Sequence, residues 1–201
     1  MTIMKFLVFS DVHEDNKQLA KLEKRAKEED IDFVIVAGDF TNFNRSLKGV
    51  CKQFNSWGKP VYIIPGNHEE GEDYEKTVAE FENLTNLHKS HLELNDYVFL
   101  GYGGDGFSKQ DAEFRKIARS WYGKFKTKKV VLITHGPAYK TKLDKLPMGH
   151  VGNVDYRKFI ERIKPRLCIS GHIHETMGEI DKIENTKLIN PCWDGMVIEL
   201  K

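Results

Sequence analysis

The 201-residue sequence predicts an α/β fold, with a mixed β-sheet and helices packed on its outer faces. Apolar runs of strand length alternate with segments whose apolar residues recur at helical spacing. The run over residues 4–10 is almost continuously apolar, which is typical of a strand buried on both faces. No linker, repeat or low-complexity stretch interrupts the chain, so we expect residues 1–201 to form a single domain.

The first half of the chain alternates strictly between predicted strands and helices. Asp15 or Asn16 can cap the first helix, and Gly58 and Pro60 end the second. In order, the predicted elements are a strand over residues 4–10, a helix from 15 or 16 to about 29, strand Phe33–Ala37, a helix from about 45 to 57, strand Val61–Ile64, a helix over 73–87 and strand Tyr97–Tyr102.

The second half continues the same alternation. A helix over residues 111–122 precedes a strand over 129–133. The next helix is capped near Asn153, and a strand over residues 167–170 follows it. Residues 178–200 contain two or three short strands.

Composition and charge disfavour several classes of protein. The formal net charge of +1 provides no global field that would attract nucleic acid or a membrane surface. The three cysteines, Cys51, Cys168 and Cys192, are too far apart for a disulfide framework or a Cys-based zinc site. No segment approaches the roughly 20 apolar residues that span a bilayer, and residues 4–10 lack the flanks of a signal peptide. We therefore expect a cytoplasmic protein without a membrane partner.

Five short polar motifs contain five of the eight histidines, and four of these motifs directly follow a predicted strand. Because strand ends from distant parts of a sequence converge at one edge of an open α/β sheet, we expect these side chains to form one site. The motifs are Asp11-Val12-His13, Gly38-Asp39, Gly66-Asn67-His68, Thr134-His135-Gly136 and Gly171-His172-Ile173-His174.

The donor atoms of these motifs predict a site for divalent metal ions. Imidazole nitrogen, carboxylate oxygen and one amide oxygen suit manganese, iron, zinc or nickel. Seven donors are too many for one tetrahedral ion, but two ions about 3.5–4 Å apart can use them if Asp39 is shared. The seven candidate ligands are Asp11, His13, Asp39, Asn67, His135, His172 and His174.

A pair of metal ions predicts phosphoryl transfer. Such a pair clamps the attacking and leaving oxygens of an in-line displacement and lowers the pKa of a bound water towards ~7. His68 follows Asn67 directly, so the two side chains diverge. We expect His68 near the phosphate, as a cation or a general acid.

The other histidines give weaker signals. His88 and His91 flank the end of a predicted helix, and we expect them at the surface. His150 lies in a glycine-rich loop between His135 and His172, which makes it a candidate substrate contact. Each motif taken singly also has a structural explanation; the complete set at strand ends is what indicates a site.

At these residues the chain resembles the calcineurin-like metallophosphoesterase superfamily, and the resemblance covers all five motifs that define it. The resemblance implies a four-layer α/β/β/α sandwich with two mixed sheets flanked by helices. It implies that Asp39 bridges two metal ions and that His68 is the catalytic histidine. It further implies that Asp11, His13 and His174 hold one ion, and that Asn67, His135 and His172 hold the other.

Four stretches are similar to a narrower branch, the small metallophosphoesterases related to mammalian metallophosphoesterase-domain proteins and bacterial Icc-like phosphodiesterases. These stretches are residues 134–137, 149–153, 165–167 and 170–175. Two positions depart from relatives. Asn42 stands where purple acid phosphatases place a metal-binding tyrosine, and it is a second candidate substrate contact. Asn190-Pro191-Cys192-Trp193 stands where many relatives have Asn-Pro-Gly-Ser, which leaves the substrate contacts of this loop open.

Together these features predict a metal-dependent phosphodiesterase that acts on a small or nucleotide-like phosphodiester, with two divalent ions as cofactors. Manganese is our first choice, and iron, zinc, nickel and cobalt are alternatives. A phosphomonoesterase is the alternative activity, because the same metals support both. A DNA nuclease is disfavoured, since the net charge gives no signal for tracking phosphates. A protein-binding scaffold would have lost ligands, and none is missing from the motifs.

Overall fold

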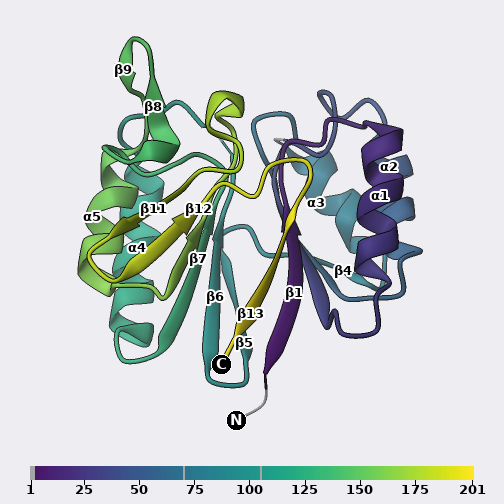
Figure 1. The fold of residues 1–201 in the computed structure, drawn as a ribbon, viewed down its shortest axis with the longest axis horizontal. Coiled ribbons are helices and arrows are strands. Elements are labelled where there is room, and N and C mark those ends of the chain that lie inside the picture. The colour runs from purple at the N-terminus through teal and green to yellow at the C-terminus, as the bar shows by residue number, and fades with distance from the viewer. Residues whose placement is uncertain (1–2, 70, 105) are drawn as a thin grey trace.

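The computed structural model describes residues 3–69, 71–104 and 106–201, and two large β-sheets face each other at its centre (Figure 1). Helices α1 (Asn16–Ala26), α2 (Leu47–Asn55) and α3 (Glu72–Ala79) cover the outer face of one sheet. Helices α4 (Ala112–Phe125) and α5 (Val154–Ile163) cover the outer face of the other. This layering confirms the predicted four-layer α/β/β/α sandwich.

The first sheet has the strand order β13-β1-β2-β3-β4. Its strands β1 to β4 run parallel, and β13 pairs antiparallel with β1. The carboxyl ends of the four parallel strands therefore lie at one edge. The strands are β1 (Met4–Phe9), β2 (Phe33–Ala37), β3 (Val61–Ile64), β4 (Leu84–Asn86) and β13 (Met196–Leu200).

The second sheet has the strand order β11-β12-β10-β7-β6-β5. The four inner strands run parallel, and the two edge strands are antiparallel to their neighbours. The strands are β5 (Ser90–Leu94), β6 (Tyr97–Tyr102), β7 (Lys129–Thr134), β10 (Leu167–Ile169), β11 (Ile180–Ile183) and β12 (Thr186–Ile189). A small hairpin, β8 (Lys145–Leu146) and β9 (Gly149–His150), projects beyond this half (Figure 1).

Alternate residues of β1 face opposite layers, and this explains its continuous apolar run. Leu7 and Phe9 pack under the helices, whereas Phe6 and Val8 pack between the two sheets. Between the sheets the Phe6 ring stacks on Phe33 at a centroid distance of 4.9 Å. Burial on both faces is thus the physical reason that this strand is apolar throughout.

The helix ends follow their caps. Asp15 Oδ1 accepts the backbone N–H groups of Lys17 and Gln18, which fixes the start of α1. Asn153 caps α5, as predicted. Helix α1 ends at Ala26, earlier than expected. Within the described ranges, no helix has both the length and the apolar character needed to cross a membrane.

The predicted helix over residues 73–87 is wrong in its second half. Helix α3 ends at Ala79, and Leu84–Asn86 forms strand β4, whose Leu84 pairs with Val61 of β3. Phe81 and Leu84 continue the helical spacing of α3, so the pattern alone indicates a longer helix. Pairing along the free edge of β3 overrides it. Edge strand β5 was not predicted either, because its residues are only half-buried or exposed.

Candidate metal centre

The predicted ligand residues come together where the carboxyl ends of strands from the two sheets meet. Asp11 and Asp39 lie just beyond β1 and β2 of the first sheet. His135 and His172 lie beyond β7 and β10 of the second sheet. An edge where parallel strands end is the usual position of a site in an α/β fold. The other donors are Asn67 beyond β3, His13 in the loop of Asp11, and His174 in the loop of His172.

Four of these residues adopt a backbone conformation that most side chains avoid. The φ angles of Asp11, His13, Asp39 and His172 are 56°, 42°, 50° and 70°. This left-handed region costs a residue with a Cβ roughly 1–2 kcal/mol. Strain of this kind gathers at functional sites, where the surrounding structure holds it in place. The turns therefore place donor atoms at some cost in conformational energy.

Two glycines allow the loops to approach each other closely. Gly38 has a φ of 92°, and a Cβ there would overlap the Nδ1 atom of His135. A Cβ on Gly66 would overlap the carboxylate of Asp39. Any larger residue at either position would force the Asp39 and His135 loops apart.

The first donor group consists of Asp11, His13 and His174, whose donor atoms all lie within 4.8 Å of one another. The Nε2 atoms of His13 and His174 are 3.3 Å apart, and His174 Nε2 is 3.8 Å from Asp11 Oδ1. Two imidazole nitrogens facing each other at this distance can share only one proton, whereas a metal ion accepts a lone pair from both. The donor chemistry therefore fits a divalent metal.

The second donor group consists of Asp39, His135 and His172, again within 4.8 Å. Asp39 Oδ2 lies 3.4 Å from His135 Nε2, and Asn67 Oδ1 lies 3.2 Å from the same nitrogen. Asp39 Oδ2 is also 3.9 Å from His13 Nε2 of the first group. One carboxylate oxygen thus lies between the two groups of donors.

His68 lies beside both groups. Its Nε2 is 4.0 Å from Asp39 Oδ2, and its ring packs edge-on against His13 with the centroids 4.7 Å apart. Its backbone N–H donates to Asp39 Oδ1 at 3.0 Å. The buried Nδ1 atom of His68 has no hydrogen-bond partner in the described part of the chain. The geometry lets His68 reach either a metal ion or a phosphate.

Burial and charge shift the pKa values of this centre in opposite directions. Burial acts to raise the pKa of Asp39, but the hydrogen bond and charge of His135 lower it to about 2. Burial acts to lower the pKa of His135, but the hydrogen bond and charge of Asp39 raise it to about 9. Burial raises the pKa of Asp11. In the absence of metal these shifts favour a proton on the Asp39–His135 pair at neutral pH, and a metal that bound His135 would displace it.

Glu69 anchors the centre, although it is not among the residues predicted from the sequence. Its side chain is fully buried and accepts the backbone N–H groups of Asp39 at 2.8 Å and Gly66 at 2.9 Å. It also accepts both the N–H and the hydroxyl of Thr41 at 2.7 Å. Burial raises the pKa of Glu69 to about 7. One carboxylate thereby ties the loop after β2 to the loop after β3.

The two candidate substrate contacts lie in different surroundings. Asn42 Nδ2 donates to the backbone carbonyl of His13 at 2.9 Å, so Asn42 supports the first donor group. His150 belongs to β9, and its Nδ1 lies 2.8 Å from Oδ1 of Asp144, the residue directly before β8. Among the described residues, no contact joins His150 to a predicted ligand. A substrate role for either residue remains a prediction.

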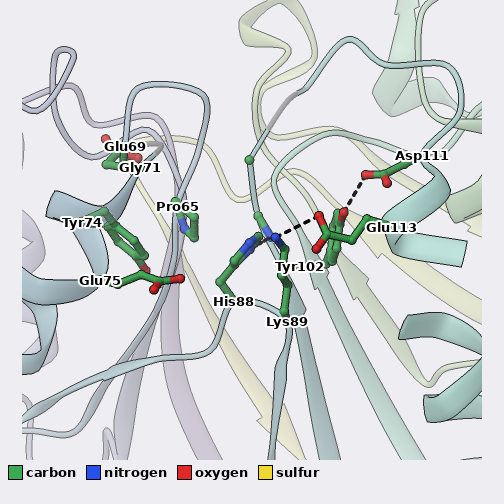
Figure 2. Close-up of a pocket in the computed structure, with 12 residues that line it drawn as sticks. Pro65, Glu69, Gly71, Tyr74, Glu75, His88, Lys89, Tyr102, Asp111 and Glu113 are labelled. Carbon is green, nitrogen blue, oxygen red and sulfur yellow. Dashed lines mark hydrogen bonds and ion pairs between the residues drawn. The ribbon is translucent and has the colours of Figure 1, made fainter. Parts of the chain in front are cut away.

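A cavity of about 440 Å³ lies beside the loop that follows β3 (Figure 2). Pro65 and Glu69 line one side, and the start of α4 lines the other. His88 lines it too and is half-buried, so its predicted place at the surface is wrong. The Nδ1 atom of His88 accepts the backbone N–H of Gly103 at 2.9 Å, and burial lowers the pKa of His88 to about 4.

Comparison with known proteins identifies the family. Residues 4–176 match the family model described as calcineurin-like phosphoesterase. Human metallophosphoesterase domain-containing protein 1 is 28% identical over 186 residues, which cover 73% of this chain and 55% of that protein. A probable glycerophosphodiester phosphodiesterase of Arcobacter nitrofigilis is 25% identical over 156 residues, which cover 71% of this chain and 56% of that protein.

The fold matches solved structures as well. The crystal structure of TT1561 of Thermus thermophilus superposes with a TM-score of 0.79 at 14% identity, over 96% of this chain and 91% of that one. The match extends across both sheets and their helices. The chain therefore belongs to the calcineurin-like phosphoesterase family, whose chemistry is the hydrolysis of phosphoester bonds.

Proposed function

We propose that this protein is a dinuclear metal-dependent phosphodiesterase that hydrolyses a small or nucleotide-like phosphodiester. The position of Asp39 Oδ2 carries the proposal, because this oxygen lies 3.9 Å from His13 Nε2 and 3.4 Å from His135 Nε2. A carboxylate between two sets of imidazoles is suited to bridge two ions. Since both sheets supply donors, we also propose that residues 1–201 act as one domain.

Each donor group would hold one ion. Asp39 would bridge them, and manganese is the first candidate, with iron, zinc, nickel or cobalt as alternatives. When bound, the pair supplies an activated water and neutralises charge on the phosphate. Asp11, His13 and His174 would hold one ion, and Asn67, His135 and His172 the other.

The residues around the donors have separate tasks. His68, beside Asp39 Oδ2, would give a proton to the departing oxygen as a general acid. Glu69 holds the loops of Asp39 and Gly66 in register through its hydrogen bonds. This support keeps the donors in place before the substrate arrives, and such preorganisation is a large part of electrostatic catalysis.

The choice of diester over monoester is supported by the Arcobacter nitrofigilis relative, which carries the name of a probable phosphodiesterase. A phosphomonoesterase remains the alternative, because the same donors can serve both reactions. A non-catalytic scaffold is disfavoured, since every predicted donor is present and the donors form compact groups.

The test is to strip the metals, reload with manganese, and compare hydrolysis of bis-p-nitrophenyl phosphate with that of p-nitrophenyl phosphate. We expect a clear preference for the diester. Preference for the monoester would make the protein a phosphatase, and no turnover with any divalent metal would favour the scaffold.

The variant Asp39→Asn tests the bridging role, because it keeps the shape of the side chain and removes its charge. We expect the variant to lose both ions and nearly all activity. Metal analysis and turnover are measured together. An active variant with two ions bound would contradict the bridging role.

A further inference from the structure

Three exposed aromatic side chains adjoin the metal centre. Phe43, Phe107 and Trp193 have 69%, 62% and 41% of their surface exposed. The described ranges contain other exposed large apolar side chains, but all of those are aliphatic. Large apolar groups gathered at a surface mark a contact site more often than chance exposure. We call Phe43, Phe107 and Trp193 the aromatic rim.

Each ring of the aromatic rim packs on a different histidine of the centre. Phe43 stacks on His68 with the centroids 4.0 Å apart and an interplanar angle of 21°. Phe107 meets His172 edge-on at 4.2 Å, and Trp193 meets His174 at 6.1 Å. Because His172 and His174 belong to separate donor groups, the rim adjoins the centre on more than one side.

The local structure at two members of the rim, Phe43 and Trp193, is specific. Phe43 has a φ of 54°, an unfavourable conformation for an aromatic residue that stays largely exposed. The carbonyl of Trp193 accepts the side-chain amide of the buried Gln18 at 2.9 Å. The rim residues come from three loops that precede α2, α4 and β13. Their convergence on one site therefore depends on the whole fold.

We propose that the aromatic rim binds a planar aromatic group of the substrate, so that the preferred phosphoester is a nucleotide whose base stacks on these rings. This inference rests on the proposed phosphoesterase function. A phosphate at the donor groups leaves the base one sugar away, close to rings that pack on the same histidines. Aromatic side chains bind bases through their π-faces without reading individual hydrogen bonds.

The test compares a ligand that has a base with a ligand that has the same sugar and phosphate but no base. The manganese-loaded protein is titrated with adenosine 5′-monophosphate and with ribose 5-phosphate. We expect the nucleotide to bind about 10-fold or more tightly, the scale of one base stacked on an aromatic ring. Equal affinities would overturn the inference.

Tryptophan fluorescence provides a second readout. The chain has three tryptophans, and Trp57 and Trp121 are only 2% and 4% exposed. Quenching by a stacked base would therefore report on Trp193. We expect quenching with the nucleotide and none with ribose 5-phosphate. The same response to both ligands would contradict contact between the base and Trp193.

Variants separate recognition from mere support of the histidines. Trp193→Phe removes the fluorescent indole, so the quenching should disappear. The variant keeps an aromatic ring, so it should still prefer the nucleotide. Trp193→Leu and Phe43→Leu should each reduce that preference several-fold. Met148→Ala, which removes a side chain 84% exposed in the β8–β9 turn, is the matched control and should change nothing. If the rim variants weaken both ligands equally, the rim only supports the histidines and the inference fails.

The proposed function and this inference fail in different ways. If the protein hydrolyses diesters but binds adenosine 5′-monophosphate and ribose 5-phosphate with equal affinity, the inference is wrong and the proposed phosphodiesterase function stands. If the manganese-loaded protein hydrolyses no phosphoester, the proposed function fails whatever the rim binds.

Discussion

His68 illustrates how one residue can be tested for two roles at a metal centre. Its Nε2 lies 4.0 Å from Asp39 Oδ2, and its ring is fixed between Phe43 and His13. We predict that His68→Ala keeps both ions and slows turnover by roughly 10²–10⁴-fold, the usual contribution of a general acid.

The leaving group provides the control for His68→Ala. The loss should be largest for alkyl esters, because p-nitrophenolate departs without a proton. The measurements are kcat over a series of leaving groups and the metal content. A variant that loses metal would identify His68 as a ligand instead.

Cys192 is a second residue whose conformation leads to a prediction. It has a φ of 65°, in the left-handed region that favours glycine over residues with a Cβ. We predict that Cys192→Gly raises stability by about 0.5–1 kcal/mol, or a few degrees in Tm, because glycine adopts this conformation without strain.

Cys192→Ala is the matched control, since it also removes the thiol but keeps the Cβ. Thermal unfolding of both variants should place the glycine variant above the alanine variant. The reverse order would show that the thiol packing outweighs the backbone strain.

At the scale of elements, the crossover from β4 to β5 carries the chain from one sheet to the other, and His88 lies within it. Its Nδ1 can accept the Gly103 N–H only when the ring is neutral there. Burial lowers the pKa of His88 to about 4, so the unfolded chain takes up a proton near pH 6.5 before the folded protein does. Stability is therefore lost as the pH falls from about 6.5 to 4.

As the pH falls, protonation of His88 lowers the free energy of unfolding. We predict that His88→Gln abolishes up to roughly 2–3 kcal/mol of this decrease, because a glutamine amide does not titrate. Urea unfolding at pH 7 and pH 4.5 measures the effect. His91→Gln is the control. His91 is an exposed residue of β5, three residues after His88, and its variant should behave like the unchanged protein. Equal pH dependence in the protein and in His88→Gln would contradict the role of His88.

The elements differ in how far their sequence determines them. Strands β2, β3 and β6 begin and end at the predicted residues, because all their residues except the half-buried Tyr62 are buried, which leaves a clear apolar run. Strand β4 was not predicted, because its identity comes from pairing with β3 rather than from its own pattern.

The same distinction applies to the site. Donors at strand ends were predictable from local motifs, whereas the role of Glu69 depends on Asp39 and Thr41, which lie 30 and 28 residues away. The partners of Asn42 and His150 are the His13 carbonyl and Asp144, and these contacts follow from the tertiary fold rather than from the position of either residue between motifs.

At the scale of the whole molecule, the donor groups join the two sheets. Asp11 and Asp39 extend from the first sheet, and His135 and His172 extend from the second. The backbone N–H of His172 donates to the Asp11 carboxylate at 3.0 Å, which links them directly. Bound metal would add a stronger link, and any ligand that binds only the folded state raises its stability.

This link leads to a prediction about metal and pH together. Without metal, burial acts to lower the pKa of His135, but the hydrogen bond and charge of Asp39 raise it to about 9, above the value near 6.5 in the unfolded chain. The resulting stabilisation is fully present below about pH 6.5 and is lost as the pH rises towards 9. A metal must displace the His135 proton, so its apparent affinity rises over the same range.

We therefore predict that manganese raises Tm, and that the gain over the metal-free protein increases from about pH 6.5 to 8.5. Thermal unfolding with and without manganese at several pH values measures it. Asp39→Asn should show no gain at any pH, because the variant lacks the charge that joins the two donor groups. A gain that stays constant or shrinks as the pH rises would mean that the metal does not compete with the His135 proton, and that the ions are held by other residues.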